Sequence, residues 1–423
     1  MKRNLGNLAI LALVLLNLVI WLAFPPMNDG RENFARAWAG EILGSTVIIL
    51  MAVSLFLSTR PKWAEAFFGG LDKMYGAHRR AAVSAFLLLF LHVLTVPISA
   101  AWRLGNYMAM TAFLGVVTLV LVTLAPRIPL LSKLTGASYD GWRKAHRFMG
   151  VFYALGFFHT FFVHSLSALV AFTWVQTVFL VGLASYLYTE FFSGFSKKRL
   201  PYEVEMVRHL NGNTAEVTLR PRARGLLHRP GQFLFVRFDP DKILGEPHPF
   251  TISSAPGEGT LRLTIKACGD WTRHLYQALA PGAGATVEGA YGLFDYKRGG
   301  QEQVWIAGGI GVTPFLSFLR DANGKLDRQV DFFYTVRTRE EALCLDEIMA
   351  AGSSDPAFRP HVRFSLEDGS LTVDEICKQV GGDLRQRHVY MCGPLGMVQS
   401  FAAQFRALGV PADHIHFEEF NFR

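Results

Sequence analysis

Two pairs of histidines lie in stretches of the chain that are otherwise apolar. His78 and His92 are 14 residues apart in one predicted helix, and His146 and His159 are 13 apart in another. At about 1.5 Å rise per residue, these separations correspond to roughly 21 and 20 Å. The two helices are expected to run in the same direction, so each histidine of one helix lies level with one of the other. Imidazole is costly inside a bilayer, and two level pairs could bind two stacked hemes as axial ligands.

The helical phase of the second pair needs a further assumption. A 14-residue spacing returns to nearly the same face of a helix, whereas 13 residues place His159 about 140° away from His146. His164 is in phase with His146 but lies roughly 27 Å along the helix, too far to match the other helix. We therefore prefer His159 and expect Gly150 or Gly156 to let the helix bend or rotate. The alternative is that the four histidines are bonded separately to carbonyl groups or to each other.

Two short motifs between residues 229 and 254 suggest a flavin site. Arg229-Pro-Gly-Gln-Phe233 precedes a predicted strand, and His248-Pro-Phe-Thr-Ile-Ser-Ser254 follows it. Thr251 and its neighbours could donate hydrogen bonds to flavin N5 and O4, and Gly269–Thr272 offers free amides at a strand-to-helix turn for the pyrophosphate. The predicted flavin-binding residues are Arg229, Gly231, Gln232, His248, Pro249, Phe250, Thr251, Ser253, Ser254, Lys266, Gly269, Asp270, Trp271 and Thr272.

A glycine-rich loop after residue 307 suggests a second nucleotide site. Gly308–Pro314 follows the predicted strand 303–307; Thr313 is expected to N-cap the next helix and Pro314 suits its first position. Cys392 and Gly393 end another strand of the same sheet, at the carboxyl edge where ligands bind. Arg337 or Arg339 could hold a 2′-phosphate, although a solvated loop is the alternative. The predicted nicotinamide-binding residues are Gly308, Gly309, Gly311, Val312, Thr313, Pro314, Arg337, Arg339, Cys392, Gly393 and Pro394.

The composition indicates what positions these residues. Of 423 residues, 51% are hydrophobic and 18% charged, and the net charge of +8 is diluted over the whole chain. These values exclude a disordered chain, a collagen and a nucleic-acid-binding tail, so we expect no nucleic-acid partner. The excess hydrophobicity lies before residue 196, in six runs of about the length that spans a bilayer. The runs cover residues 5–24, 41–58, 80–101, 107–125, 147–164 and 168–192.

Basic residues predict the orientation of these six helices. They gather before the first run, between the second and third, between the fourth and fifth, and after the sixth, which places both termini in the cytoplasm. A signal peptide is the alternative for the first run, but the run is long and Pro25-Pro26 follows it instead of a cleavage site. The four cysteines then face the reducing side, in agreement with free thiols. They are Cys268, Cys344, Cys377 and Cys392.

Three domains follow from these patterns. Residues 1–196 are expected to form a six-helix transmembrane di-heme domain. Residues 197–298 alternate in the way typical of a small antiparallel β-barrel, the predicted FAD-binding domain. Residues 299–423 alternate strand and helix signals, which predicts a parallel α/β domain for NAD(P)H. The fold class is therefore membrane α plus α/β.

The histidine pairs, His248–Thr251, Gly269–Thr272, Gly308–Pro314 and Cys392-Gly-Pro394 together resemble the NADPH oxidase branch of the ferric reductase superfamily in its compact prokaryotic form. The resemblance implies FAD, two b-type hemes and NADPH (or NADH) as cofactors, with a dehydrogenase half like ferredoxin–NADP reductase. It implies an integral protein of the bacterial inner membrane that reduces dioxygen to superoxide on the far side. Thr251, Cys392 and a terminal aromatic over the flavin, Phe420 with Phe422 second, are the implied catalytic residues.

Two departures from that family leave the acceptor open. Animal oxidases carry a further histidine four residues past the outer ligand, where this chain has Val96. No calcium-binding or other regulatory extension is evident, so no regulatory subunit is expected. The same electron chain could serve a ferric-chelate reductase, or a relay that docks a redox partner protein at its outer face.

Overall fold

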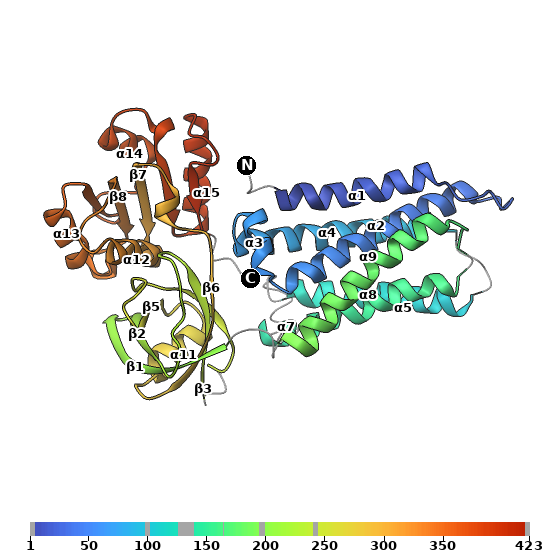
Figure 1. The fold of residues 1–423 in the computed structure, drawn as a ribbon, viewed down its shortest axis with the longest axis horizontal. Helices are drawn as coiled ribbons and strands as arrows, with labels where there is room; N and C mark the ends of the chain where they lie inside the picture. Colours follow the sequence, from blue (N-terminus) through green and yellow to red (C-terminus); the bar gives the residue numbers. More distant parts are fainter. Residues whose placement is uncertain are drawn as a thin grey trace. The chain divides into compact units, whose positions relative to one another are not determined.

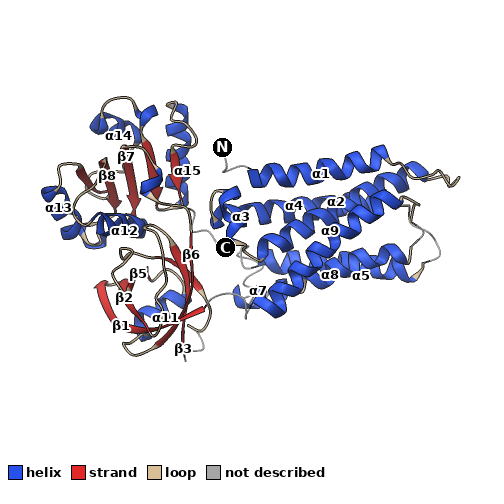
Figure 2. Cartoon of the chain, in the orientation of Figure 1, coloured by secondary structure: helices blue, strands red, loops and turns tan. Residues whose placement is uncertain are grey.

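The structure is a computed structural model that describes residues 5–97, 102–125, 139–163, 165–193, 199–239 and 244–418. It divides into two compact units, Met1–Ser196 and Lys197–Arg423. The first unit is helical and the second holds the strands (Figures 1 and 2). Each unit is described by itself.

Among the described residues of the first unit, five helices are long and apolar enough to cross a membrane. They are α1 (Leu5–Ala23), α2 (Phe34–Ser58), α4 (Leu71–Thr95), α5 (Leu104–Leu124) and α9 (Leu169–Leu187) with its π-helical extension η4 (Tyr188–Phe192). The short helix α3 (Lys62–Phe68) connects α2 to α4. Many of their leucines and phenylalanines are exposed, as expected for surfaces that face lipid rather than water. The length and apolar surface of these helices suggest a membrane protein.

The predicted apolar helix over 147–164 is not one continuous helix. The chain forms α7 (Tyr139–His146), turns at Arg147 and Phe148, resumes as α8 (Met149–Phe158) and tightens into the 3₁₀ turn η3 (His159–Phe161). The described helices therefore do not form the six equal spans that hydropathy predicted. The interruption falls directly before Gly150, and the 3₁₀ turn begins three residues after Gly156, so the expected change of phase occurs near both glycines.

Side-chain contacts between distant segments pack this unit. On α1, Asn17 donates to Ser45 Oγ at 2.9 Å and to Thr46 Oγ1 at 3.1 Å on α2. Between α8 and α9, the rings of Phe157 and Phe179 stack with centroids 3.8 Å apart. Hydrogen bonds from Asn17 and an aromatic stack thus tie successive helices of the chain to one another.

The first half of the second unit is a six-stranded antiparallel sheet with strand order β4-β3-β6-β1-β2-β5. Helix α11 (Asp270–Ala278) packs its Trp271 and Leu275 onto the sheet's core. The sequence predicted a small barrel at this place. The structure has this sheet instead, and a single β-bridge between Ile252 and Leu263 joins its two edges. The strands are β1 (Arg199–Asn211), β2 (Thr214–Pro221), β3 (Phe233–Asp239), β4 (His248–Thr251), β5 (Leu261–Lys266) and β6 (Gly284–Tyr291).

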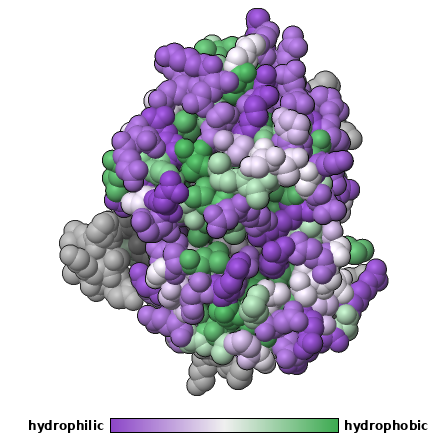
Figure 3. Space-filling model, turned by 90° about the vertical axis from the view of Figure 1, so that its left-hand side faces the viewer, coloured by the Kyte–Doolittle hydropathy of each residue, from purple (hydrophilic) through white to green (hydrophobic). Residues whose placement is uncertain are grey.

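The second half is a five-stranded parallel sheet with order β11-β10-β7-β8-β9, as the alternating pattern predicted. Helices α12 (Thr313–Ala322) and α13 (Leu345–Ser354) cover one face, and α14 (Val373–Val380) and α15 (Leu395–Ala407) cover the other. The side of the molecule in Figure 3 is largely hydrophilic with scattered apolar side chains. The strands are β7 (Glu302–Gly308), β8 (Gln329–Val336), β9 (Phe358–Phe364), β10 (His388–Cys392) and β11 (Ile415–Phe417).

Candidate functional site

Three of the four predicted histidine ligands bind a backbone carbonyl through Nδ1. His78 and His92, both on α4, bond Ser54 O and Gly40 O of α2, each at 2.8 Å. His159 bonds Gly156 O at 2.5 Å. A ring that donates from Nδ1 presents Nε2 to a metal, and metal-ligating histidines almost always have such a partner. This bonding also fits the alternative that each histidine is simply satisfied by a carbonyl group.

The fourth histidine differs from these three, and the pairing of the rings favours the ligand interpretation. His146 Nδ1 is buried with no hydrogen-bond partner among the described residues, so no carbonyl group orients this ring. The ring of His146 lies within electrostatic range of His78, and that of His159 within range of His92, which is the predicted pairing. His164, the alternative ligand, lies outside the described residues.

A glycine of α2 leaves room for one of these imidazole rings. A Cβ at Gly44 of α2 would lie 2.9 Å from His92 Cε1, so only glycine leaves room for that imidazole. In the described part of the chain, no group of three or more His, Cys, Asp or Glu could hold a metal ion. A bis-histidine heme needs only two imidazoles per iron, so the residues present fit two such hemes.

The basic residues near the inner pair have protein partners. Arg147 donates from Nε to Glu190 Oε2 at 2.8 Å, and Arg80 donates to Asn7 Oδ1 at 2.9 Å. An arginine next to a heme-ligating histidine can bind a heme propionate, or it can anchor the helix at the membrane surface. These bonds occupy part of each guanidinium and leave the choice between the two roles as a prediction.

Aromatic rings line the predicted flavin strand. The rings of His248 and Phe250 on β4 stack with Trp271 of α11, with centroids 4.3 and 5.5 Å apart and both pairs 28° from parallel. Between them in sequence, Pro249 pairs with Phe235 of β3. Thr251, buried at the end of β4, pairs with Phe233. The strand therefore leads from an aromatic stack to the hydroxyl predicted to meet the flavin.

The Arg229–Gln232 motif forms a turn that is held by the protein itself. Gln232 Oε1 accepts from Arg229 N at 2.9 Å, and Gln232 Nε2 donates to Gly292 O at 3.0 Å. Gly231 has φ +80°, and a Cβ there would lie 2.2 Å from Phe294 O, so glycine is required. The Arg229 side chain is exposed. Of this motif, Arg229 keeps a side chain available for a ligand.

Several predicted hydroxyl donors are bonded inside the protein. Ser253 Oγ donates to Arg262 O at 3.0 Å, and Ser254 Oγ accepts from Arg262 N at 3.1 Å. Thr272 Oγ1 accepts from the amides of Cys268 and Gly269, both at 2.9 Å. These three residues thus shape the site, and an anion there would meet the first amides of α11.

The remaining charged candidates of the flavin region also have partners. Lys266 Nζ lies 3.5 Å from Glu341 Oε2, and Asp270, the first residue of α11, pairs with Arg273. Both Lys266 and Asp270 are close to the predicted pyrophosphate position in sequence. Their roles in binding stay predictions.

The two predicted nicotinamide loops touch at the carboxyl edge of the parallel sheet. A Cβ at Gly311 would lie 2.3 Å from Cys392 O, and one at Gly393 would lie 3.0 Å from Gly308 Cα. Pro394 packs on Gly308 in the same way, with Cδ 2.8 Å from the position of a Cβ. In the sheet, β8 lies on one side of β7 and β10 lies on the other, so the strand order reverses at β7. The loops after β7 and β10 therefore meet at the switch point, which is where parallel sheets of this kind bind ligands.

Thr313 does not cap α12 as predicted. The 3₁₀ turn η6 (Gly309–Val312) runs directly into α12, so Thr313 is already helical and Val312 takes the cap position without a side-chain bond. Val312, Thr313 and Pro314 are all buried. A capping hydroxyl needs an extended residue before the helix, and the continuous turn leaves none.

Cys392 is buried and surrounded by acidic and apolar groups. Burial, and then the charge of Glu418, raises the pKa of the Cys392 thiol well above its usual value. The thiol therefore stays neutral, as a hydrogen-bonding or packing group beside the site. Glu418 itself reaches toward Gly292, where a Cβ would lie 2.7 Å from its Oε1.

The two arginines predicted to read the 2′-phosphate follow β8 and are both exposed. Arg339 lies over the Phe364 ring with its guanidinium carbon 4.9 Å from the centroid. Arg337 contributes its carbonyl to a bond from Leu366 N. Phe420 and Phe422 lie outside the described residues.

Comparisons with known proteins address the second unit. Residues 200–301 match the FAD-binding domain family and residues 305–403 match the oxidoreductase NAD-binding domain family. The chain carries ferredoxin-reductase-like FAD-binding and NAD-binding domains.

Relatives of these domains occur in several electron-transfer systems. The reductase component of propane 2-monooxygenase from Rhodococcus jostii is 30% identical over 40% of this chain and 49% of its own length. NADPH oxidase 1 of Mus musculus is 32% identical over 37% of this chain and 28% of its own. Dual oxidase 2 of Rattus norvegicus is 30% identical over 60% of this chain and 17% of its own length. The chain thus spans about half or less of the length of these relatives.

One solved structure is similar over most of the chain. Flavohemoglobin from Malassezia yamatoensis, with bound FAD and heme, aligns with a TM-score of 0.50 at 17% identity, covering 90% of this chain and 97% of that one. At this identity the likeness concerns the fold alone.

Proposed function

We propose that this chain is a transmembrane NAD(P)H oxidase that passes electrons from cytosolic NADPH through FAD and two b-type hemes to dioxygen, producing superoxide. One observation carries the proposal: a single chain combines FAD-binding and NAD-binding oxidoreductase domains with a membrane unit whose paired histidines bond carbonyls through Nδ1. The NADPH oxidase and dual oxidase relatives support the same function. We place it in a bacterial inner membrane with both termini in the cytoplasm.

The second unit would bring the nicotinamide against the flavin. Bound FAD accepts a hydride as an electron pair and can release single electrons. The first amides of α11 would bind its pyrophosphate, and Thr251 would donate to the flavin ring. Gly308–Pro314 would bind the nicotinamide nucleotide, and the neutral Cys392 thiol beside it would pack against the nicotinamide.

In the membrane unit, His78 with His146 and His92 with His159 would hold the two hemes. A heme with two imidazole ligands changes its iron by one electron without needing an open coordination position. The carbonyls of Ser54, Gly40 and Gly156 fix three of the rings so that Nε2 is available. The protein thus supplies orientation and a dry environment for each ligand.

A ferric-chelate reductase is the second candidate, and one contact favours it. The side chain of Val96, at the position where the resemblance implies a further histidine, packs on Gly40: a Cβ there would lie 2.6 Å from Val96 Cγ1. No imidazole is therefore available at this position for an oxygen site. An electron relay to a partner protein is the third candidate, supported by the monooxygenase reductase components among the relatives.

One assay separates the three. The purified, FAD- and heme-loaded protein is mixed with NADPH, first with oxygen alone and then with a ferric chelate under argon. Superoxide formed at a rate that accounts for NADPH consumption supports the oxidase. Consumption only with the chelate identifies a ferric reductase, and consumption with neither acceptor favours the relay.

A further inference from the structure

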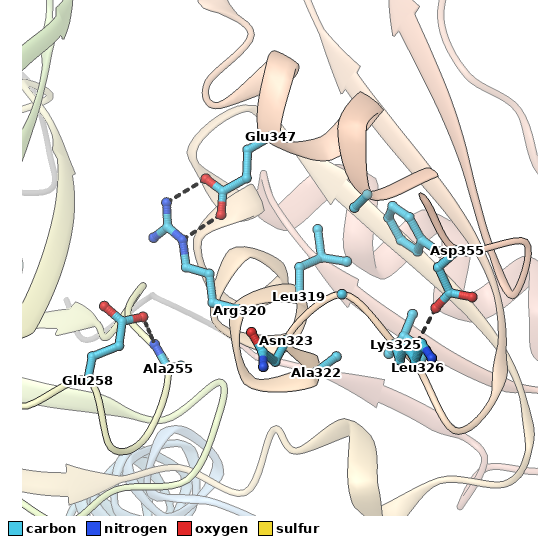
Figure 4. Close-up of a pocket in the computed structure, with 13 residues that line it drawn as sticks. Ala255, Glu258, Leu319, Arg320, Ala322, Asn323, Lys325, Leu326, Glu347 and Asp355 are labelled. Carbon is cyan, nitrogen blue, oxygen red and sulfur yellow. Dashed lines mark hydrogen bonds and ion pairs between the residues drawn. The ribbon is translucent and has the colours of Figure 1, made fainter. Parts of the chain in front are cut away.

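One arginine ties the NAD-binding half of the second unit to the flavin strand. Arg320, in the last turn of α12, has a side chain only 7% exposed. Its Nη1 donates to Ser253 O at 2.7 Å. Its Nε and Nη2 donate to the two carboxylate oxygens of Glu347, each at 2.7 Å (Figure 4). One turn earlier, Ser317 Oγ donates to Ser254 O at 2.8 Å. The backbone carbonyls of Ser253 and Ser254 thus both accept hydrogen bonds from side chains on one face of α12.

These carbonyls belong to the segment that positions Thr251. Ile252 follows Thr251 directly, and its amide donates to Gln232 O at 2.9 Å. The Ser253 amide donates to Arg262 O at 2.8 Å. The segment is therefore extended and bonded on both sides, so that a displacement at Ser253 must reach Thr251 two residues away.

The other end of α12 carries the glycine-rich loop. The helix begins at Thr313, directly after η6, and its ten residues span roughly 15 Å. Helix α12 is thus one short rigid rod with the proposed nucleotide loop at its start and the flavin-strand anchor near its end. Hydride transfer needs the reacting atoms about 3–3.5 Å apart, and a misplacement of about 1 Å can cost roughly a hundredfold in rate.

We propose that Arg320, assisted by Ser317, is a positioning residue for hydride transfer, which sets how the nicotinamide at the start of α12 meets the flavin beside Thr251. This inference rests on the proposed function. Arg320 contacts the proposed flavin site only through the backbone carbonyl of Ser253, so it acts on the flavin through that segment. Glu347 and the buried Glu216, whose Oε2 lies 3.7 Å from Arg320 Nη2, hold the guanidinium in place from α13 and β2.

The test is Arg320→Met in the full-length, FAD-loaded protein. A pocket of about 380 Å³ already borders Arg320 (Figure 4), so alanine would enlarge it, whereas methionine keeps the length of the side chain and removes its donors. Flavin reduction by NADPH is followed by rapid mixing without oxygen. We expect the limiting rate to fall at least about tenfold, with the NADPH concentration for half-maximal rate within about twofold of wild type. The long-wavelength absorbance of the nicotinamide–flavin complex should weaken in parallel.

Arg363→Met is the matched control. Arg363 also binds one carboxylate, Glu375 Oε1 at 2.9 Å, and it donates to two carbonyls, Gly369 O at 2.8 Å and Asp368 O, but to no residue of the flavin strand. It should keep the wild-type reduction rate, even if both variants melt at a lower temperature.

A second variant keeps the test decisive if the first does not retain FAD. In that case Ser317→Ala, which deletes one hydroxyl, must show a smaller fall in the limiting rate of flavin reduction by NADPH. A normal limiting rate in either FAD-loaded variant overturns the positioning role while the proposed function stands. If wild-type protein with bound FAD is not reduced by NADPH at all, the proposed function fails and the inference falls with it.

Discussion

At the scale of single residues, Gly311 has the least room for a side chain at the nucleotide loop. A Cβ would lie 2.3 Å from Cys392 O and 2.5 Å from Cys392 C, both backbone atoms that cannot move away cheaply. We expect Gly311→Ala to destabilise the unit by about 1–3 kcal/mol, as overpacking does, and to weaken NADPH binding. Gly396→Ala, which meets nothing within 4 Å, should leave stability unchanged or slightly higher.

The unfolding of this unit can be followed selectively. All four cysteines lie after residue 197, so a thiol-reactive dye reports on the second unit even in the full-length protein. Cys268 is exposed and labels at once, whereas the buried Cys392 labels only on unfolding. The labelling midpoint is the denaturant concentration at which half of the Cys392 thiol is labelled. If this midpoint were the same in Gly311→Ala as in wild type, the tight contact at Gly311 would be contradicted.

Cofactor choice is the second prediction at this scale. Arg337 and Arg339 are exposed after β8, and Phe364 already orients the Arg339 guanidinium. A guanidinium binds phosphate bidentately. Removing whichever of the two arginines binds the 2′-phosphate should therefore weaken NADPH binding by about 1.5–3 kcal/mol, which raises KM for NADPH roughly 10–100-fold. KM for NADH should stay nearly unchanged. Single alanine variants of both arginines, assayed with each cofactor, test this; equal losses with NADPH and NADH would show that the arginine binds the pyrophosphate or supports the fold.

At the scale of elements, an ion cluster joins the amino-terminal ends of the parallel strands. Asp331 of β8 is 1% exposed and accepts from Arg359 of β9 at 2.7 and 2.8 Å and from Arg387, before β10, at 3.1 Å. Burial alone would raise the pKa of Asp331, but the bonds from Arg359 and His361 and the charges of both arginines lower it to about 2. The carboxylate thus favours the folded state.

We expect Asp331→Asn to cost about 3 kcal/mol at neutral pH, the low end for breaking a buried ion pair, because Arg359 is half-exposed. A depressed folded pKa gives stability that is present above the unfolded pKa of about 4 and lost as pH falls toward 2. The difference in denaturation midpoint between wild type and Asp331→Asn, followed at each pH by circular dichroism, should therefore shrink over that range. Asp383→Asn, which removes an exposed ion pair with Arg385, should change little. A constant difference down to pH 2 would contradict the assignment.

Stacked histidines join β10 to β11. His388 Nδ1 lies 2.8 Å from His416 Nε2, and the rings of His388 and His414 stack 4.0 Å apart. Burial, and then the charge of His414, lowers the pKa of His388, while Asp413 acts in the opposite direction. The ring of Tyr390 also belongs to this cluster and stacks on the ring of His416, with centroids 4.3 Å apart.

This cluster predicts a loss of stability in mild acid. Because the folded pKa of His388 is below the unfolded value of about 6.5, the unfolded chain binds the proton first, and stability falls as pH drops below about 6.5. The labelling midpoint should decrease between pH 7.5 and 5.5, and less so in His388→Gln. His209→Gln, an exposed histidine bonded to Tyr276 O, serves as the control and should keep the full decrease. Equal pH dependence in all three proteins would refute the prediction.

At the scale of the whole molecule, the proposed electron path depends on ligands from two separate helices. We expect His92→Leu and His159→Leu each to lower heme content from two per chain to one, since each iron needs both imidazoles. Flavin reduction by NADPH should survive, and reduction of oxygen should fail. His164→Leu should keep both hemes. Loss of a heme in His164→Leu but not in His159→Leu would reassign the ligand on the second helix.

The sequence by itself determined what depends on local pattern. The change of composition near residue 196 coincides with the boundary of the two compact units, and the strand and helix alternation after residue 299 predicted the parallel sheet. The glycine loop at 308–314 was also readable, because glycine is needed wherever backbone approaches backbone. Periodicity and composition are properties of neighbours in the chain, so these features needed no knowledge of long-range contacts.

Only the tertiary structure decided what distant segments do to one another. The carbonyls that orient His78 and His92 come from α2, a helix that the histidine spacing does not involve. Hydropathy predicted one helix over 147–164, but only Met149–Phe158 is α-helical, because hydropathy counts apolar residues and cannot register the 3₁₀ turn that begins at His159. Arg320 belongs to no motif, and its contact with Ser253 spans 67 residues of sequence. Such contacts arise from the packing of whole elements, which no local pattern specifies.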